Sequence, residues 1–340
     1  MKAMICERFG GPEVLAERDV NDPAPPGPGE IQVRIAARGV QYVDVLMLAG
    51  TYQFRPEPPF IPGGEAAGYV VAAGPGVTGF AIGDAVMSRH GLGAFAELAN
   101  AKAVLCDKVP TGLTMAQAGV FRGAYTTAYH ALLQRGRLKT GEWVLIHGAA
   151  GGIGIAAIQV AKAFGAKVIA TAGSDLKRSA CLEEGADHAI DYRSGFVDAV
   201  KALTGGRGVD IVYDPIGDKV AEESLRCLAW GGRLLILGFL GGGPTNIRSN
   251  YLLIKGIDVV GVRIGGLNEA DPTLASANMM ALLALAEQGK LRPRISHSFR
   301  LNRAADALQA VIDRAVIGKA VLLSDAGAPA PAVAGRTIGG

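Results

Sequence analysis

The sequence predicts an α/β chain in which a β-rich part is joined to a doubly wound sheet of six parallel strands. Two observations predict this fold class. Residues 1–110 are rich in Gly and Pro and hold short alternating apolar runs, whereas beyond residue 115 buried apolar runs alternate with helical segments. With 340 residues, the chain is long enough for two such domains, each with its own core.

The β-rich part is indicated by its strand and turn signals. Ile31–Ala36 and Gly68–Ala73 read as strands, and they are bounded by turn signals at Pro25–Gly29 and Gly74–Gly76. We therefore expect a compact β domain with irregular loops in this part of the chain.

The parallel sheet is predicted from six apolar strand cores. They are Trp143–Ile146, Lys167–Ala170, Ala189–Ile190, Asp210–Tyr213, Arg233–Leu237 and Asp258–Val262. Helices are expected at Met115–Leu133, Ile153–Phe164, Asp175–Glu184 and Gly195–Leu203. Buried strands that alternate with helices at this spacing favour a parallel sheet of the dinucleotide-binding kind.

The last part of the chain turns helical. Helices are expected at Asn278–Gln288 and Ala304–Arg314, and a final strand at Lys319–Leu323. The tail Ser324–Gly340 is mostly Ala, Gly and Pro with little periodicity, so we expect it to be disordered.

Net charge, apolar segments and cysteine spacing indicate which classes of protein this sequence does not resemble. The net charge is only +3, and no block of like charges indicates a nucleic-acid-binding arm. Neither a signal peptide nor a membrane span is apparent. The four cysteines are far apart with no C-x-x-C pair, which suits buried thiols in a reducing compartment. We therefore expect a cytoplasmic protein.

A glycine loop between a strand and a helix carries the strongest functional signal. The strand ending at Ile146 leads into a glycine turn that opens an apolar helix, the setting of a dinucleotide fingerprint. Gly151 allows the backbone to approach a pyrophosphate, and Gly154 permits close packing of helix on strand. Together with Ala150, the N–H groups of Gly152 and Ile153 are expected to face the phosphates.

The cofactor is predicted to be NADPH. An NAD enzyme places a carboxylate about 20 residues past the glycines, but the second strand here ends in Ala172-Gly173. A carboxylate about 4 Å from a phosphate charge costs on the order of 4 kcal/mol, and a lysine gains a similar amount. Lys177, Arg178 and Tyr192 are therefore expected to reach the 2′-phosphate, and Gly173 and Ser174 are expected to bind the cofactor beside them. In the alternative interpretation, Lys177 and Arg178 form only a solvated helix face.

Together these segments resemble the zeta-crystallin type of quinone oxidoreductase, in the medium-chain dehydrogenase/reductase superfamily. The resemblance covers roughly residues 1–323. Besides the glycine loop, it rests on Gly39–Asp44, Pro62–Gly68, Gly83–Val86, Thr127–Tyr129, Gly185–Asp187, Gly231–Arg233 and Gly318–Lys319.

The resemblance implies a division into domains. A GroES-like catalytic domain would comprise residues 1–125 and 263–323, split around a Rossmann domain at 126–262, with the nicotinamide in the cleft between them. Segment Gly256–Val262 would be an edge strand, at which this family often forms homodimers.

A zinc site is not expected. Gln41 lies in the stretch where the zinc alcohol dehydrogenases carry Cys, and Gly64 stands in the position of their His. The five histidines show no ligand spacing, so the three or four N or S donors of a tetrahedral site cannot be assembled.

Without a metal, the expected chemistry is hydride transfer to a quinone or to the C=C bond of an enone, both already electrophilic. Tyr52 matches a nicotinamide-binding tyrosine of the quinone reductases and resembles a proposed proton donor of related thioester reductases; the alternative is a structural aromatic. Gln41 replaces the family's usual Asn near the cleft and is the second catalytic candidate, with Tyr42 a weaker one.

Further cofactor contacts are expected from Thr127, Leu237, Gly238, Phe239, Val262 and Arg263. Asp44 and Asp214 are interpreted as structural.

Two other functions stay open. An enoyl-CoA-type thioester reductase needs a basic patch for the CoA phosphates, and Arg122, Arg248 and Arg263 are scattered candidates. An NADPH-binding structural or RNA-binding protein with little turnover is the other, although no aromatic-interleaved basic stripe supports RNA binding.

Overall fold

The computed structural model describes residues 1–324, which divide into two compact units. Unit 1 is made of Met1–Arg122 and the chain from Ile295 onward, and unit 2 is Gly123–Arg294. The expected division assigned residues 263–323 to the catalytic domain, but in the structure the part up to Arg294 belongs to unit 2. Almost all of the tail expected to be disordered lies outside the described residues.

A hydrogen-bonded pair explains why unit 2 extends past residue 262. The side-chain amide of Asn278, on helix α10 (Pro272–Glu287), donates to the side-chain oxygen of Gln134 at 3.0 Å. Met279 and Leu282 of the same helix are buried. This helix is therefore anchored in the core of unit 2.

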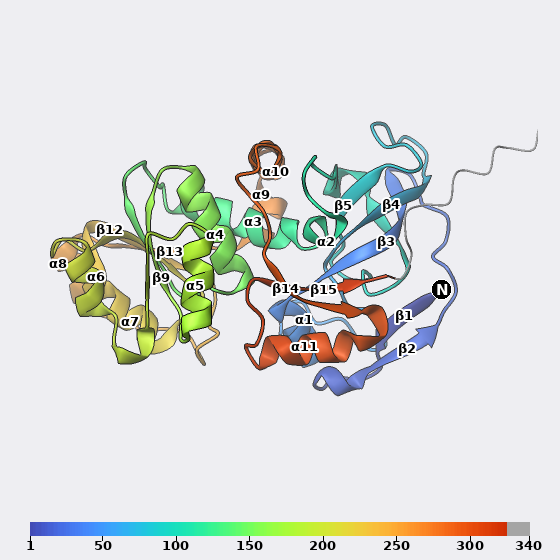
Figure 1. The fold of residues 1–340 in the computed structure, drawn as a ribbon. Coiled ribbons are helices and arrows are strands. Elements are labelled where there is room, and N and C mark those ends of the chain that lie inside the picture. Colours follow the sequence, from blue (N-terminus) through green and yellow to red (C-terminus); the bar gives the residue numbers. More distant parts are fainter. Residues whose placement is uncertain (325–340) are drawn as a thin grey trace, which may run out of the picture. The chain divides into compact units, whose positions relative to one another are not determined.

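Unit 1 contains a seven-stranded sheet and a separate pair of antiparallel strands (Figure 1). The pair is β1 (Lys2–Cys6) with β2 (Leu15–Asp19). The sheet has the order β14-β15-β3-β4-β5-β7, and β6 pairs with β3. Its strands are β3 (Glu30–Val40), β4 (Glu65–Ala73), β5 (Ala85–Arg89), β6 (Leu98–Lys102), β7 (Cys106–Lys108), β14 (Ile295–Arg300) and β15 (Lys319–Leu323).

Three helices complete unit 1, and they tie its two chain segments together. They are α1 (Tyr42–Leu48), α2 (Met115–Ala118) and α11 (Ala304–Ile312). Val40 and Leu48 share one buried cluster with Leu308 and Leu322, so the first and last parts of the chain form one core. Burial of such side chains stabilises by about 1.5–3 kcal/mol each.

Unit 2 contains the predicted sheet of six parallel strands, in the order β10-β9-β8-β11-β12-β13. The strands are β8 (Trp143–Ile146), β9 (Lys167–Thr171), β10 (His188–Ile190), β11 (Val209–Asp214), β12 (Leu228–Ile236) and β13 (Asp258–Gly261). The predicted fold class is therefore confirmed. Strand β12 begins at Leu228, earlier than the expected Arg233.

Helices cover both faces of this sheet, with α4 and α5 on one side and α6 and α7 on the other (Figure 1). On β11, Val212 lies in the buried cluster with Val197 of α6 and Leu225 of α7, whereas the neighbouring Tyr213 hydroxyl reaches the Ile153 carbonyl of α4. The helices are α3 (Phe121–Tyr129), a π-helical turn (His130–Arg135), α4 (Gly152–Ala163), α5 (Asp175–Glu183), α6 (Val197–Leu203), α7 (Asp218–Cys227), α8 (Ser249–Lys255), α9 (Ile264–Ala270) and α10. No helix within residues 1–324 combines the length and apolar character needed to cross a membrane.

Candidate functional site

The glycine loop after β8 adopts a backbone that favours glycine. Gly148 has φ of 56°, in the left-handed region. A Cβ atom at Gly154 would lie 2.5 Å from the carbonyl oxygens of Gly148 and Ala149. The predicted need for glycine at 154 is therefore met by a contact between the first turn of α4 and the end of the strand before it.

The first turn of α4 offers backbone N–H groups. Gly151 is the N-cap residue and has no side chain to accept a hydrogen bond from them. Gly152 and Ile153 are half-buried at this end, and the helix behind them is almost wholly buried. Ala150, just before the N-cap, is 5% exposed. Such a helix terminus favours an anionic group, because its donors and its dipole act together.

The end of β9 is the next part of the site. Ser174 is the N-cap residue of α5, and its hydroxyl accepts the Lys177 N–H at 3.4 Å. A Cβ atom at Gly173 would lie 3.1 Å from the Tyr192 hydroxyl, so the tyrosine packs against the bare backbone of the glycine. Three predicted residues with no negative charge, Gly173, Ser174 and Tyr192, therefore surround this strand end.

Arg178 is held in an ion-pair cluster close by. Its guanidinium contacts Asp175 and lies 3.1 Å from Asp191, and it donates to the Ala172 carbonyl at 3.3 Å. Hydrogen bonds from Arg193, aided by Arg178, hold the pKa of Asp191 well below its ordinary value. The Arg178 side chain therefore supports the loop at β10, and Lys177, in the first turn of α5, stays a predicted phosphate contact.

The ends of β11 and β12 are joined by backbone hydrogen bonds. The buried Asp214 carboxylate accepts the N–H groups of Ile216 at 2.8 Å and Gly217 at 3.1 Å, while burial raises its pKa. Leu237 N–H donates to the Asp214 carbonyl at 2.9 Å. Gly217 has φ of 75°, and a Cβ atom there would lie 2.9 Å from Phe239. Segment 214–217 thus supports the predicted residues Leu237, Gly238 and Phe239.

Segment 214–217 was not among the predicted site residues. The signal available in the sequence is Asp214-Pro215-Ile216-Gly217 directly after a buried strand, where a turn residue with positive φ is expected. The interpretation of Asp214 as structural agrees with its role as an acceptor for backbone N–H groups.

The cofactor candidates come together because of strand direction. All six strands of unit 2 are parallel, so the segments that follow them meet at one edge of the sheet. The glycine loop, Gly173–Lys177, Tyr192, Leu237–Phe239 and Val262–Arg263 all follow the carboxyl end of a strand. Val262 is held there by its N–H, which donates to the Ile236 carbonyl at 2.9 Å. Thr127 instead lies on α3, where its hydroxyl donates to the Gly123 carbonyl at 2.7 Å.

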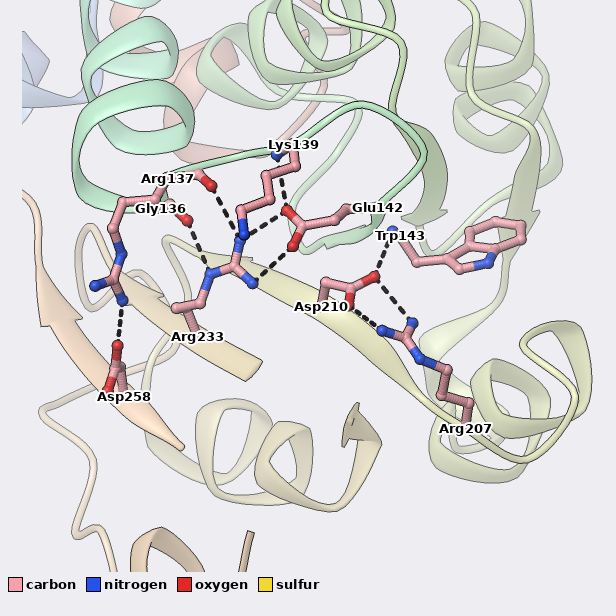
Figure 2. A network of polar contacts seen from close by, with 9 residues as sticks. All are labelled: Gly136, Arg137, Lys139, Glu142, Trp143, Arg207, Asp210, Arg233 and Asp258. Atoms are coloured by element: carbon pink, nitrogen blue, oxygen red, sulfur yellow. Dashed lines mark hydrogen bonds and ion pairs between the residues drawn. The ribbon is translucent and has the colours of Figure 1, made fainter. Parts of the chain in front are cut away.

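The opposite edge of the sheet carries a polar network around the strand starts (Figure 2). Arg233 pairs with Glu142 at 2.7 Å and donates to the Gly136 carbonyl at 2.8 Å. Asp210 accepts the Trp143 N–H at 2.8 Å and pairs with Arg207. Because ligands of open α/β sheets bind at the carboxyl ends, we interpret this network as structural.

His147, beside the glycine loop, is also structural. It is 1% exposed, and burial lowers its pKa to about 3, so the ring is neutral. The Ser224 hydroxyl donates to the Val220 carbonyl at 2.6 Å and therefore accepts from His147 Nε2–H at 2.8 Å. Nδ1 then accepts from the Thr171 hydroxyl at 3.0 Å. Both ring nitrogens are thus used to hold β8, β9 and α7 together.

In unit 1 the two catalytic candidates lie at the two ends of α1. Gln41 is the N-cap residue of this helix, and Tyr52 follows shortly after its last residue, Leu48. Both side chains are half-buried. The Tyr52 hydroxyl makes no hydrogen bond to another residue within the described part of the chain, so it is available to a ligand.

A buried charge cluster lies next to α1. Asp44, interpreted from the sequence as structural, lies within electrostatic reach of Glu65 and Lys319. Lys319 Nζ lies 3.0 Å from Glu65 Oε1, and all three residues are buried. The three residues come from α1, β4 and β15, far apart in sequence, so no local pattern indicates their grouping.

The donor set of unit 1 does not fit zinc. Gln41 and Gly64 stand where the zinc alcohol dehydrogenases carry Cys and His, and Glu65 is paired with the Lys319 ammonium. Within residues 1–324 no three His, Cys, Asp or Glu side chains are grouped so that they could hold a metal ion. Tetrahedral zinc needs three or four such donors.

Comparisons with known proteins agree over nearly the whole chain. Residues 27–136 match the model described as the alcohol dehydrogenase GroES-like domain, and residues 152–281 match that described as zinc-binding dehydrogenase. Quinone oxidoreductase-like protein 2 of Rattus norvegicus is 36% identical, over 94% of this chain and 91% of its own length. Quinone oxidoreductase of Sus scrofa is also 36% identical, over 95% and 98%.

A solved structure agrees as well. The crystal structure of Escherichia coli quinone oxidoreductase complexed with NADPH has a TM-score of 0.87 and 31% identity, and covers 95% of this chain and all of its own. The identity, the coverage and the two-unit fold show that this chain belongs to the zinc-free quinone oxidoreductase-like family of the medium-chain dehydrogenase/reductase superfamily.

Proposed function

We propose that this protein transfers hydride from NADPH to a quinone, or to the C=C bond of an α,β-unsaturated carbonyl compound, without a metal. The observation that supports NADPH most directly is the end of β9. Tyr192 packs on Gly173 there, and neither Ala172 nor Gly173 carries a carboxylate. The similar E. coli protein was crystallised with NADPH.

Each group of residues has a proposed role toward the cofactor. The N–H groups of Gly152 and Ile153, next to Ala150 and Gly151, bind the pyrophosphate. Gly173, Ser174, Lys177 and Tyr192 surround the adenosine 2′-phosphate, with Lys177 supplying positive charge. Thr127, Leu237–Phe239, Val262 and Arg263 contact the nicotinamide half.

The protein binds and orients the cofactor and the acceptor, and it supplies a proton to an enone acceptor. The cofactor supplies the hydride, and a quinone or enone accepts it without Lewis-acid assistance. In this proposal the Gln41 amide donates a hydrogen bond to the carbonyl oxygen of the acceptor. Tyr52 gives its hydroxyl proton to the α-carbon of an enone after hydride addition, because that hydroxyl has no partner within the described residues.

One of the three arginines considered for the thioester reductase alternative is unsuitable. The Arg122 side chain is 13% exposed and is paired with Asp107, so it cannot belong to a surface patch for CoA phosphates. Arg248 and Arg263 remain exposed, on separate segments. The RNA-binding alternative gains no support from the positions of these side chains.

We further propose a cytoplasmic homodimer. The four cysteines are free and buried, which suits a reducing compartment. Strand β13 forms one edge of the unit 2 sheet, and Val259 on it is 37% exposed. An exposed apolar edge strand favours pairing with a second copy.

The test is the initial rate of NADPH and NADH oxidation with EDTA present. The acceptors are 1,2-naphthoquinone, 3-penten-2-one and crotonyl-CoA. We expect turnover of the quinone or the enone with NADPH preferred. Absence of turnover with every acceptor, although NADPH binds, would favour the binding-protein alternative, and crotonyl-CoA as the best acceptor would favour the thioester reductase.

Tyr52→Phe separates the two chemistries within this proposal. It removes the proton but keeps the ring, so the enone rate should fall by about 10²-fold or more while the quinone rate changes little. Tyr69→Phe, on β4, is the matched control and should leave both rates unaltered. An equal, small effect of Tyr52→Phe on both acceptors would contradict the role as proton donor.

A further inference from the structure

The chain segment that carries Tyr52 lacks the backbone hydrogen bonds that hold its neighbours. The N–H of Thr51 donates to the last turn of α1 at 3.0 Å, and the N–H of Phe60 donates to β1 at 3.2 Å. Within the described part of the chain, residues 52–59 make no backbone hydrogen bond to one another or to any other residue. Side-chain contacts therefore determine where Tyr52 lies, because a loop without backbone hydrogen bonds opens at low cost.

The Phe9 side chain offers this segment a fixed surface. Phe9 packs against the buried cluster of unit 1 that contains Leu48. The next residue, Gly10, donates its N–H to the Leu48 carbonyl at 2.9 Å, so the chain around the ring is bound to the end of α1. The Phe9 side chain is only half-buried, which leaves part of the ring for another side chain to cover.

Arg55 lies on this ring. Its guanidinium carbon is 4.5 Å from the centroid of the Phe9 ring, within the range of a cation–π interaction. Gly50 has φ of 68°, and a Cβ atom there would lie 3.0 Å from the Phe9 ring and 3.3 Å from Arg55 Nε. The two ends of turn 50–55 therefore meet at Phe9, and Tyr52 lies between these ends in the sequence.

The Arg55 side chain has no competing polar partner in the described structure. Within residues 1–324 its guanidinium takes part in neither an ion pair nor a hydrogen bond, so the Phe9 ring is the contact that sets its direction. Pro56 follows directly and restricts the backbone of Arg55 to extended conformations. Both effects reduce the number of ways in which the turn can close.

We propose that Arg55 is a positioning residue: by lying on the Phe9 ring, its guanidinium closes the turn that carries Tyr52 and holds the tyrosine hydroxyl in place. The closure follows from the contacts within unit 1 alone. Its effect on turnover rests on the proposed function, in which Tyr52 protonates an enone, because proton transfer requires the donor within hydrogen-bond reach of the accepting atom. Quinone reduction takes no proton from Tyr52 and should depend little on Arg55.

The first measurement is independent of activity. The full chain is digested briefly with chymotrypsin, and mass spectrometry gives the rate of cleavage after Tyr52, which increases with the population of the open turn. Each rate is divided by that of a synthetic peptide of residues 48–60 with the same sequence, which corrects for the susceptibility of the bond itself. Arg55→Gln and Phe9→Leu should each raise this ratio by about two- to fivefold, as expected for loss of an exposed cation–π contact.

Three comparisons make this measurement specific. Arg55→Lys keeps a cation for the ring and should stay closer to the wild type than Arg55→Gln. Arg34→Gln, at an exposed position of β3, is the matched control and should show the wild-type rate. Cleavage after Trp230, which is 82% exposed on unit 2, should be the same in every variant.

Two outcomes of the digestion overturn the proposal. One is unchanged cleavage after Tyr52 in Arg55→Gln, and the other is an equal increase in Arg55→Gln and Arg55→Lys. Because Arg55 is exposed, its variants are expected to fold even if Phe9→Leu does not.

The second measurement is kcat/KM for 3-penten-2-one with NADPH. Arg55→Gln should lower this value by about two- to fivefold, while the value for 1,2-naphthoquinone changes little. In a Tyr52→Phe background the hydroxyl is absent, so Arg55→Gln should cause no further loss. An unchanged enone value, or an equal loss in both backgrounds, contradicts the positioning role.

The two readouts separate the two proposals. Faster cleavage after Tyr52 in Arg55→Gln, in a protein that turns over no acceptor, supports closure of the turn by Arg55 and contradicts the proposed function. An enone rate that falls in Tyr52→Phe but not in Arg55→Gln, with unchanged cleavage, contradicts the inference about Arg55 alone.

Discussion

The contact between Gly173 and Tyr192 leads to a prediction about cofactor preference. In Gly173→Asp, a carboxylate extends from the chain just after β9, beside the Tyr192 hydroxyl. Repulsion of the 2′-phosphate should raise KM for NADPH by about tenfold or more, while KM for NADH falls or stays unchanged. Steady-state kinetics with both cofactors measures this change.

Gly173→Ala is the control for this prediction. It adds the Cβ atom, which lies 3.1 Å from the movable end of the Tyr192 side chain, but it adds no charge. The NADPH preference should persist in this variant. Equal losses in the Ala and Asp variants would show that space, rather than charge, determines the preference.

For the proposed cofactor site, the sequence predicts local backbone geometry where the determinant is local. Gly151 and Gly154 follow directly from a strand, a turn and a helix that are consecutive in the sequence. The partners of Asp44 could not, because Lys319 and Glu65 are 254 residues apart and meet only through strand pairing. Arg178 illustrates the same limit, since its pairing with Asp191 depends on how β10 lies beside β9.

At the scale of elements, the network in Figure 2 leads to a stability prediction. Arg233 is 8% exposed, and its charge is matched by Glu142. Glu142→Gln removes that charge and leaves a buried guanidinium uncompensated. The free energy of unfolding should therefore decrease by about 3 kcal/mol in urea denaturation.

Arg137→Ala tests whether burial explains this effect. Arg137 pairs with Asp258 at the same edge of the sheet, but both side chains are more than half exposed. Exposed pairs contribute about 0–1 kcal/mol, so this variant should be close to wild type. A loss as large as that of Glu142→Gln would mean that the whole network, rather than the buried pair, stabilises the strand starts.

Elements were predictable where hydrophobic periodicity was strong. The six strands of unit 2 are close to their expected positions, apart from the early start of β12. The expected helix Met115–Leu133 is interrupted instead at Gly119, whose missing Cβ would lie 2.9 Å from Ala37 of β3. Strand β14 was missed, because its alternating pattern is made partly of Ser and His, which do not mark a buried face.

At the scale of the whole molecule, the proposed homodimer can be tested at the sheet edge. Val259→Lys places a charge on β13, and such a charge blocks edge pairing. We expect the wild type to sediment as a dimer and the variant as a monomer in analytical ultracentrifugation. Val104→Lys is the control, since Val104 is 87% exposed on unit 1 and should not affect the sedimentation.

The outcome can also go against this edge. If Val259→Lys sediments as a dimer, the dimer interface does not include the edge of β13. A monomeric wild type would refute the homodimer itself and leave the assignment of the family untouched.

The split of unit 1 between the two ends of the chain has a consequence for biosynthesis. Strand β3 emerges from the ribosome early, but its neighbour β15 is made last, after all of unit 2. Until then residues 37–40 at one edge of β3 are unpaired, Val40 and Leu48 lack Leu308 and Leu322, and Glu65 lacks its ammonium. Unit 2, a continuous stretch of chain, can fold while unit 1 waits, so the nascent protein depends on protection of that open edge until translation ends.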